Sequence, residues 1–118
     1  MQKYKINGWI DLIDKIPLIK GTDNIENIHV KNFITDSKKI TIYLDTKRYA
    51  TEEEKEYHKI YESNNGFTHF GILDLIQQTY WSAYKDIYIN DSYSFSNLAL
   101  HTFYFDPNTN SVYPNTDS

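Results

Sequence analysis

Two segments of the chain alternate between apolar and polar side chains, which is the pattern of a β-strand with one face against a core. In residues 39–45 the apolar positions are Ile40, Ile42 and Leu44. In residues 98–105 two sets alternate, with Leu98, Leu100, Thr102 and Tyr104 opposite Ala99, His101, Phe103 and Phe105. We therefore expect strands in both segments and a fold that depends on a sheet.

Two further segments carry strand signals. Residues 28–34 begin with the same alternation and then shift phase, which predicts a strand with a β-bulge. This strand lies close enough in sequence to 40–44 to pair with it as an antiparallel hairpin. The nearly continuous apolar run from Phe70, extended as far as Trp81, favours a strand buried on both faces over a helix turn.

The last third of the chain predicts short strands separated by turns. Residues 86–90 alternate as a strand, and Asp106–Asn110 has the composition of a turn. Residues 111–113 are expected to return as a short strand at the edge of the sheet. Residues 112–118 are expected to end the chain as a loose tail.

Two short helices are predicted from apolar residues at helical spacing. In 7–17, Asn7 can cap the first turn and Pro17 ends the helix. In 52–62, Thr51 and Glu54 have the spacing of a capping box. The expected fold is therefore a single α+β domain over 1–118, with a mostly antiparallel sheet of about six strands and two short helices.

Composition narrows the class of protein. A chain of 118 residues can hold its fold by a hydrophobic core alone, and it contains no cysteine for disulfides or thiolate metal sites. The N-terminal residues are polar, and no apolar run long enough for a signal peptide or a membrane span follows them. We expect a cytoplasmic protein that does not bind a membrane.

Residues with catalytic potential are few. The four histidines stand apart in sequence, and the four glycines form no phosphate-binding pattern, so we expect neither a metal nor a cofactor. Asp74 lies inside an apolar run, where burial would raise its pKa and suit it to acid–base chemistry. The simpler interpretation places Asp74 at a solvent-exposed position, so we expect no enzymatic activity.

Charge and tyrosine content point instead to a binding surface. The net charge is −4, and residues 86–118 contain four aspartates but no lysine or arginine. Such a distribution disfavours nucleic acid and favours a basic protein partner. Tyrosine beside carboxylate is suited to capturing lysine and arginine side chains. The predicted partner-binding residues are Glu52, Glu53, Glu56, Tyr57, Asp86, Tyr88, Asp91 and Tyr93.

The order of these segments resembles a known family. An early Trp9 and short helix are followed by the histidine-bearing segment 27–33, then by 39–45 and 70–75, and a late pair of strands closes the chain. This order is similar to the small β-rich immunity proteins of bacterial polymorphic toxin systems, especially the family numbered fifty in that series. The resemblance implies that the protein neutralises a cognate toxin by tight binding, with no cofactor and no turnover.

Two other functions are compatible with the sequence. The first is a small hydrolase-like enzyme that uses Asp74, a histidine and a neighbouring acid in a cleft, which would require those side chains to converge. The second is a structural or adaptor module that self-associates through the edge at 111–113. Neither alternative has a positive signal in the sequence, so both rank below the binding of a toxin.

Overall fold

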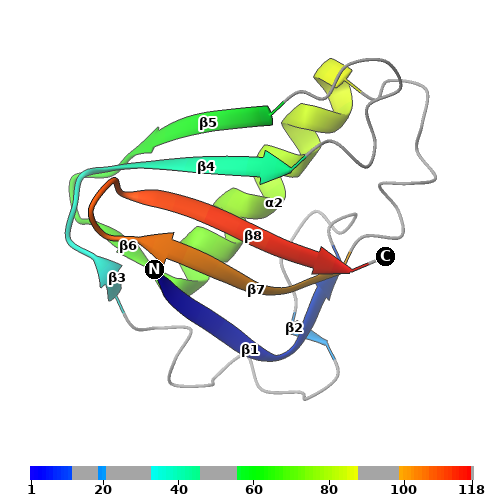
Figure 1. The fold of residues 1–118 in the computed structure, drawn as a ribbon, viewed down its shortest axis with the longest axis horizontal. Coiled ribbons are helices and arrows are strands. Elements are labelled where there is room, and N and C mark those ends of the chain that lie inside the picture. The colour runs from blue at the N-terminus through cyan, green and yellow to red at the C-terminus, as the bar shows by residue number, and fades with distance from the viewer. Residues whose placement is uncertain (12–18, 21–32, 46–55, 88–98, 118) are drawn as a thin grey trace.

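The computed structural model describes residues 1–11, 19–20, 33–45, 56–87 and 99–117. Eight strands and one helix lie in these residues (Figure 1). The helix, α2, spans His69–Ile87. The strands are β1 (Gln2–Asp11), β2 (Ile19–Lys20), β3 (Phe33–Thr35), β4 (Lys39–Asp45), β5 (Glu56–Glu62), β6 (Phe67–Thr68), β7 (Ala99–Asp106) and β8 (Ser111–Asp117).

Six strands form the main sheet in the order β2-β1-β7-β8-β4-β5, and β3 pairs with β6 in a separate ladder. All pairs are antiparallel except β4 with β8. The expectation of a mixed fold that is mostly strand is therefore confirmed. The expectation of two short helices is not, because the described residues contain one helix of 19 residues.

Helix α2 replaces the buried strand predicted for Phe70 to Trp81. Its sequence offers an apolar stripe at helical spacing, and the buried members are Ile72, Leu73, Ile76, Tyr80 and Ala83. The Thr68 hydroxyl caps the first turn by accepting a hydrogen bond from the Gly71 amide at 3.0 Å. Thr79, which is β-branched, is accommodated because its hydroxyl donates to the Leu75 carbonyl at 2.6 Å. The run from Phe70 to Trp81 spans 12 residues, about three helical turns, which exceeds the usual length of a strand and was the signal for a helix.

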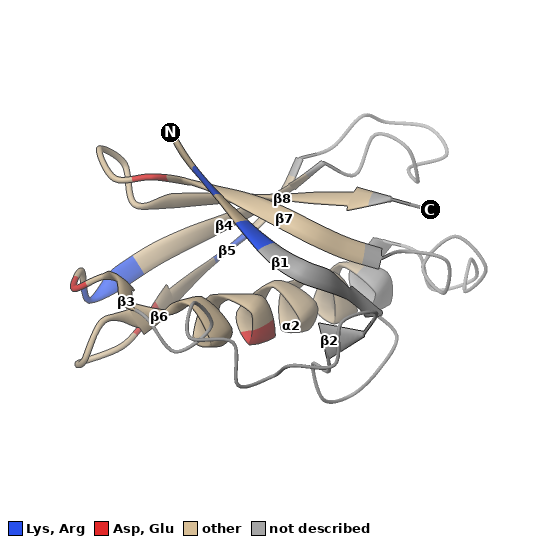
Figure 2. Ribbon diagram, turned by 90° about the horizontal axis from the view of Figure 1, so that it is seen from below, with Lys and Arg blue, Asp and Glu red and all other residues tan. Residues whose placement is uncertain are grey.

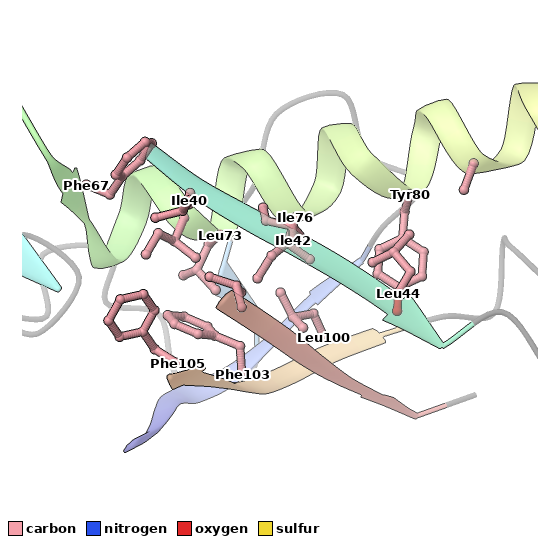
Figure 3. Close-up of a cluster of buried hydrophobic side chains, with 13 residues drawn as sticks. Ile40, Ile42, Leu44, Phe67, Leu73, Ile76, Tyr80, Leu100, Phe103 and Phe105 are labelled. Carbon is pink, nitrogen blue, oxygen red and sulfur yellow. The ribbon is translucent and has the colours of Figure 1, made fainter. Parts of the chain in front are cut away.

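The core lies between α2 and one face of the main sheet (Figure 3). The alternation in β4 is confirmed, because the side chains of Ile40, Ile42 and Leu44 are all buried. In β7 a register irregularity between Leu100 and Thr102 breaks the predicted alternation. A shift of this kind moves later side chains to the other face. The buried residues of β7 thus come from both predicted sets, and they include Leu100, Phe103 and Phe105.

Two predicted helices are wrong where the structure describes them. Residues 56–62 form β5, which pairs with β4 along its whole length, and residues 7–11 belong to β1. Tyr57 and Tyr61 are four apart, as in a helix, but they also share one face of a strand. Pairing with β4 satisfies the backbone groups of every second residue in this segment and decides between the two patterns. Residues 12–17 and 52–55 lie outside the described residues.

Three predicted strand positions also differ. Residues 111–117 form β8, which lies between β7 and β4 in the interior of the sheet, so they are neither an edge nor a loose tail. Strand β3 pairs with β6 rather than with β4, so the predicted hairpin is wrong for its described part. Residues 86–87 end α2 instead of beginning a strand. These pairings join segments far apart in sequence, and local alternation does not encode them.

The turn between β5 and β6 requires glycine at position 66. Gly66 has a φ of 77°, and a Cβ atom there would lie 2.5 Å from the Thr35 carbonyl oxygen. We expect Gly66→Ala to lower the free energy of unfolding by about 1–3 kcal/mol, because it combines left-handed strain with a clash against backbone. Urea unfolding followed by circular dichroism measures the change. Asn65→Ala in the same turn is the control and should cost less than about 0.5 kcal/mol.

Candidate functional site

The main sheet has two unlike faces. Helix α2 and the β3–β6 ladder lie on one side, called here the helix side, and no described element covers the other, called the open side (Figure 2). On β5, Lys59 and Tyr61 belong to the helix side, since they form hydrogen bonds with Ser82 and Thr79 of α2. Because side chains alternate along a strand, His58 and Ile60 lie on the open side.

An aromatic row crosses the open side at right angles to the strands. It consists of Tyr104 (β7), Tyr113 (β8), Tyr43 (β4) and His58 (β5), which is one residue from each of four adjacent strands. The rings of Tyr43 and Tyr113 stack with their centroids 5.5 Å apart and an interplanar angle of 14°. The His58 ring lies 5.4 Å from Tyr43, and Tyr104 is the register partner of Tyr113.

The row is accessible and held in place by its own contacts. Tyr113 is 37% exposed, His58 is exposed, and Tyr43 and Tyr104 are half-buried. The ammonium group of Lys3 on β1 lies 5.6 Å from the centre of the Tyr104 ring, a cation–π contact that closes one end of the row. Side chains fixed by cross-strand neighbours lose little conformational entropy when they bind a partner.

In the described part of the chain, the basic residues of this face lie at its margins. Lys3 and Lys5 belong to β1, and Lys39 at the start of β4 stands opposite Glu62 of β5 (Figure 2). The β7–β8 hairpin, residues 99–117, supplies two residues of the row and contains no lysine or arginine. The centre of the open side, as far as the structure describes it, is therefore aromatic and carries no lysine or arginine.

The helix side of β5 has a structural role. The Tyr61 and Thr79 hydroxyls lie 2.7 Å apart, and the Lys59 ammonium donates to the Ser82 hydroxyl at 3.0 Å. Burial raises the pKa of Tyr61 above its ordinary value of 10.0, the nearby Asp74 carboxylate raises it further, and the hydrogen bond with Thr79 opposes the shift. These contacts fix the edge strand to α2.

The pKa of Tyr61 predicts how stability depends on pH. Unfolding exposes the hydroxyl, which then ionises at a lower pH than in the folded state. The stability contributed by neutral Tyr61 is complete below pH 10 and is lost as the pH rises from there toward the folded pKa. We expect Tyr61→Phe to cost about 1 kcal/mol near neutral pH, through the lost hydrogen bond. It should also lose less stability than wild type on going to about pH 11. Urea unfolding at both pH values tests this, and parallel losses in the two proteins would contradict it.

The predicted partner-binding residues fall mostly outside the described structure. Glu52, Glu53, Tyr88, Asp91 and Tyr93 lie in undescribed segments. Glu56 is the first residue of β5, opposite Asp45, and Asp86 is the penultimate residue of α2. Tyr57 is half-buried and packs against the core, as its place on the helix side of β5 requires. Of the three described members, Tyr57 therefore lies on the helix side of the sheet and not on the open side.

Those residues proposed for catalysis or metal binding that the structure describes lie in different parts of the fold, and His29 lies outside the described residues. Asp74 lies on α2, where its carboxylate accepts a hydrogen bond from the Gln78 amide at 2.9 Å. His58 lies across the sheet on the open side, and His69 is buried between the rings of Tyr4 and Phe103. Within the described residues, no three histidine, aspartate or glutamate side chains are grouped closely enough to hold a metal ion.

The sequence analysis did not predict the aromatic row. The alternation of β4 placed Tyr43 opposite the buried isoleucines, and that was a usable signal for one member. The alignment of Tyr43 with Tyr113 and Tyr104 depends on the parallel pairing of β4 with β8, which joins residues some seventy positions apart. No local pattern contains that information.

Comparison with protein-family models, with curated proteins and with solved structures finds no match. In the described part of the chain, no helix is both long and apolar enough to cross a membrane.

Proposed function

We propose that this protein binds and inhibits another protein through the open side of its sheet, and that the partner is a basic bacterial toxin domain, as for an immunity protein. The observation that carries the proposal is the aromatic row. Its four rings come from four adjacent strands, and the Tyr43 ring contacts both Tyr113 and His58. In this function the protein inhibits its partner by remaining bound to it, without a cofactor and without turnover.

Tyrosine supports a protein partner for physical reasons. A tyrosine ring contributes a large contact area while losing freedom at only two side-chain torsions, and its hydroxyl supplies a directional hydrogen bond. Tyrosine is accordingly enriched among the few residues that dominate binding energy at protein interfaces. Stacking of Tyr43 on Tyr113 holds both rings before the partner arrives, which lowers the entropic cost of binding.

The charge distribution supports a basic partner. The net charge of −4 would speed association with a cationic protein, and residues 86–118 carry four aspartates and no lysine or arginine. Single-stranded nucleic acid also stacks on aromatic rows, but it requires a basic groove along its backbone. Those lysines of the open side that the structure describes lie at its margins, on β1 and at the start of β4.

Affinity capture from the native cells with three baits tests this function. The baits are wild type, a row variant carrying Tyr43→Ser and Tyr113→Ser, and a control carrying Asp74→Ser and Gln78→Ser on the solvent side of α2. We expect wild type and control to retain one basic protein at equal stoichiometry and to suppress its toxicity or activity. The row variant should retain neither property. Equal retention by the row variant would refute the proposal.

A further inference from the structure

Among the residues that the structure describes, nothing pairs with the outer edge of strand β5. It is the last strand of the main sheet, and β4 is its ladder partner in the described part of the chain. The Ser63 amide donates to the Lys38 carbonyl at 2.8 Å, which marks these residues as a hydrogen-bonded pair of the β4–β5 ladder. Because such pairs recur at every second residue, the odd-numbered residues of β5 bond to β4.

The even-numbered residues of β5 therefore direct their N–H and C=O groups away from the sheet. On the other side of β4, Thr41 donates to the Asn110 carbonyl at 3.0 Å, so its odd residues bond to β8 and its even residues to β5, as this alternation requires. His58, Ile60 and Glu62 thus present backbone groups at the edge and side chains on the open side. Ile60 is 54% exposed, an unusual position for so apolar a side chain on an edge strand.

An edge of this kind can pair with a second copy of itself across a two-fold axis. About such an axis, each residue of β5 lies opposite a residue of the other copy whose side chain is on the same face of the sheet. Each possible register therefore has a central residue, which lies opposite the same residue of the other copy. Centring on Lys59 would place Lys59 opposite Lys59 and Glu56 opposite Glu62, which opposes like charges. Centring on Ile60 places Ile60 opposite Ile60, His58 opposite Glu62 and Lys59 opposite Tyr61.

We propose that two copies of this chain associate through their β5 edges in the register centred on Ile60. The exposed isoleucines then cover each other, and each is flanked by a pair of histidine and glutamate from the two copies. Lys59 and Tyr61 keep their hydrogen bonds to Ser82 and Thr79, because those groups lie on the helix side. The charges of β5 oppose the register centred on Lys59, and the mutual covering of the exposed Ile60 side chains favours the one centred on Ile60.

Pairing of this kind leaves the three tyrosines of the aromatic row accessible, while His58 pairs with Glu62 of the second copy. The two-fold axis is perpendicular to the sheet, so both open sides face the same direction and both helices lie behind. The two six-stranded sheets become continuous across the β5 edges. The dimer is a property of the purified protein alone, and it can be present or absent independently of any toxin partner.

The test is the solution mass of the purified protein, measured by sedimentation equilibrium over about 1–500 µM. Wild type is compared with variants at the residues that the proposed pairing brings together. We expect reversible dimers of wild type, and at least a tenfold weaker dimer for Glu62→Lys and for Ile60→Lys. Asp106→Lys, which makes the same charge change at the β7–β8 turn as Glu62→Lys, is the control and should dimerise like wild type. The double variant His58→Glu/Glu62→Lys should recover the dimer, because it reverses the pair without losing it.

Three outcomes would overturn the proposal. Wild type could remain a monomer throughout the concentration range. Glu62→Lys could strengthen the dimer, as expected for the register centred on Lys59. The double variant could stay as weak as Glu62→Lys alone. Circular dichroism and urea unfolding of each variant monitor folding, since Glu62 also stands opposite Lys39 within its own sheet.

Discussion

Replacing Phe103 by alanine is expected to lower the free energy of unfolding by about 3–5 kcal/mol, a large part of the stability of a domain this size. Phe103 is completely buried on the helix side of β7. Its ring stacks on Tyr4 of β1 with centroids 5.2 Å apart and meets the edge of His69 at 5.3 Å. One side chain therefore connects β1, β7 and the first turn of α2.

Urea unfolding measured by circular dichroism and tryptophan fluorescence tests this prediction. Tyr104→Ala is the matched control, because Tyr104 is the next residue of the same strand and lies on the open side. We expect the control to lose less than about 1.5 kcal/mol, mainly through its cation–π contact with Lys3. A loss for Tyr104→Ala as large as that for Phe103→Ala would mean that the two faces of the sheet are wrongly assigned.

The second large effect is expected on binding. The double variant Tyr43→Ala/Tyr113→Ala should weaken affinity for the captured partner at least 100-fold, which corresponds to about 3 kcal/mol. The two rings stack at the centre of the row, where truncation leaves a gap between Tyr104 and His58. The free energy of unfolding of this double variant should change by much less than that of Phe103→Ala, since neither tyrosine ring is fully buried.

Isothermal titration with the captured partner measures the affinity. Asp74→Ala/Gln78→Ala removes two side chains from the solvent side of α2 and should bind within about twofold of wild type, because these residues are remote from the open side. A weakening by the helix variant that equals that of the tyrosine variant would move the interface to α2. If the tyrosine variant and the helix variant both bound with unchanged affinity, neither the aromatic row nor this side of α2 would be the interface.

The sequence predicted the strands whose pattern had a single interpretation. In β4 the alternation of isoleucine and leucine with polar residues agrees only with a half-buried strand, and all three apolar side chains are buried. The turn from Asp106 to Asn110 was also predictable, because its residue types favour turns. Asn110 adopts a φ of 54° there, a conformation that asparagine tolerates.

Errors arose where one pattern fits two structures. Tyr57 and Tyr61 satisfy helical and strand spacing alike, and only the pairing of β5 with β4 decides between them. The apolar run of α2 suggested a buried strand because its aromatic and β-branched residues favour sheets, but its length and its buried stripe are those of a helix.

The candidate site was not predictable for a different reason. The aromatic row is assembled from β4, β5, β7 and β8, and its alignment depends on β8 inserting between β7 and β4. A residue-by-residue reading identifies tyrosines and carboxylates as suitable for binding, but it cannot identify which of them lie side by side.

Tyrosine ring signals in nuclear magnetic resonance spectra provide the most direct test of the proposed interface. The rings are labelled and then assigned by the single substitutions Tyr43→Phe, Tyr104→Phe, Tyr113→Phe and Tyr61→Phe. On titration with the captured partner, we predict large shifts or broadening for the three rings of the row and little change for Tyr61, which lies on the helix side. Changes at Tyr61 with none at Tyr43, Tyr104 and Tyr113 would contradict the assignment of the open side as the binding surface.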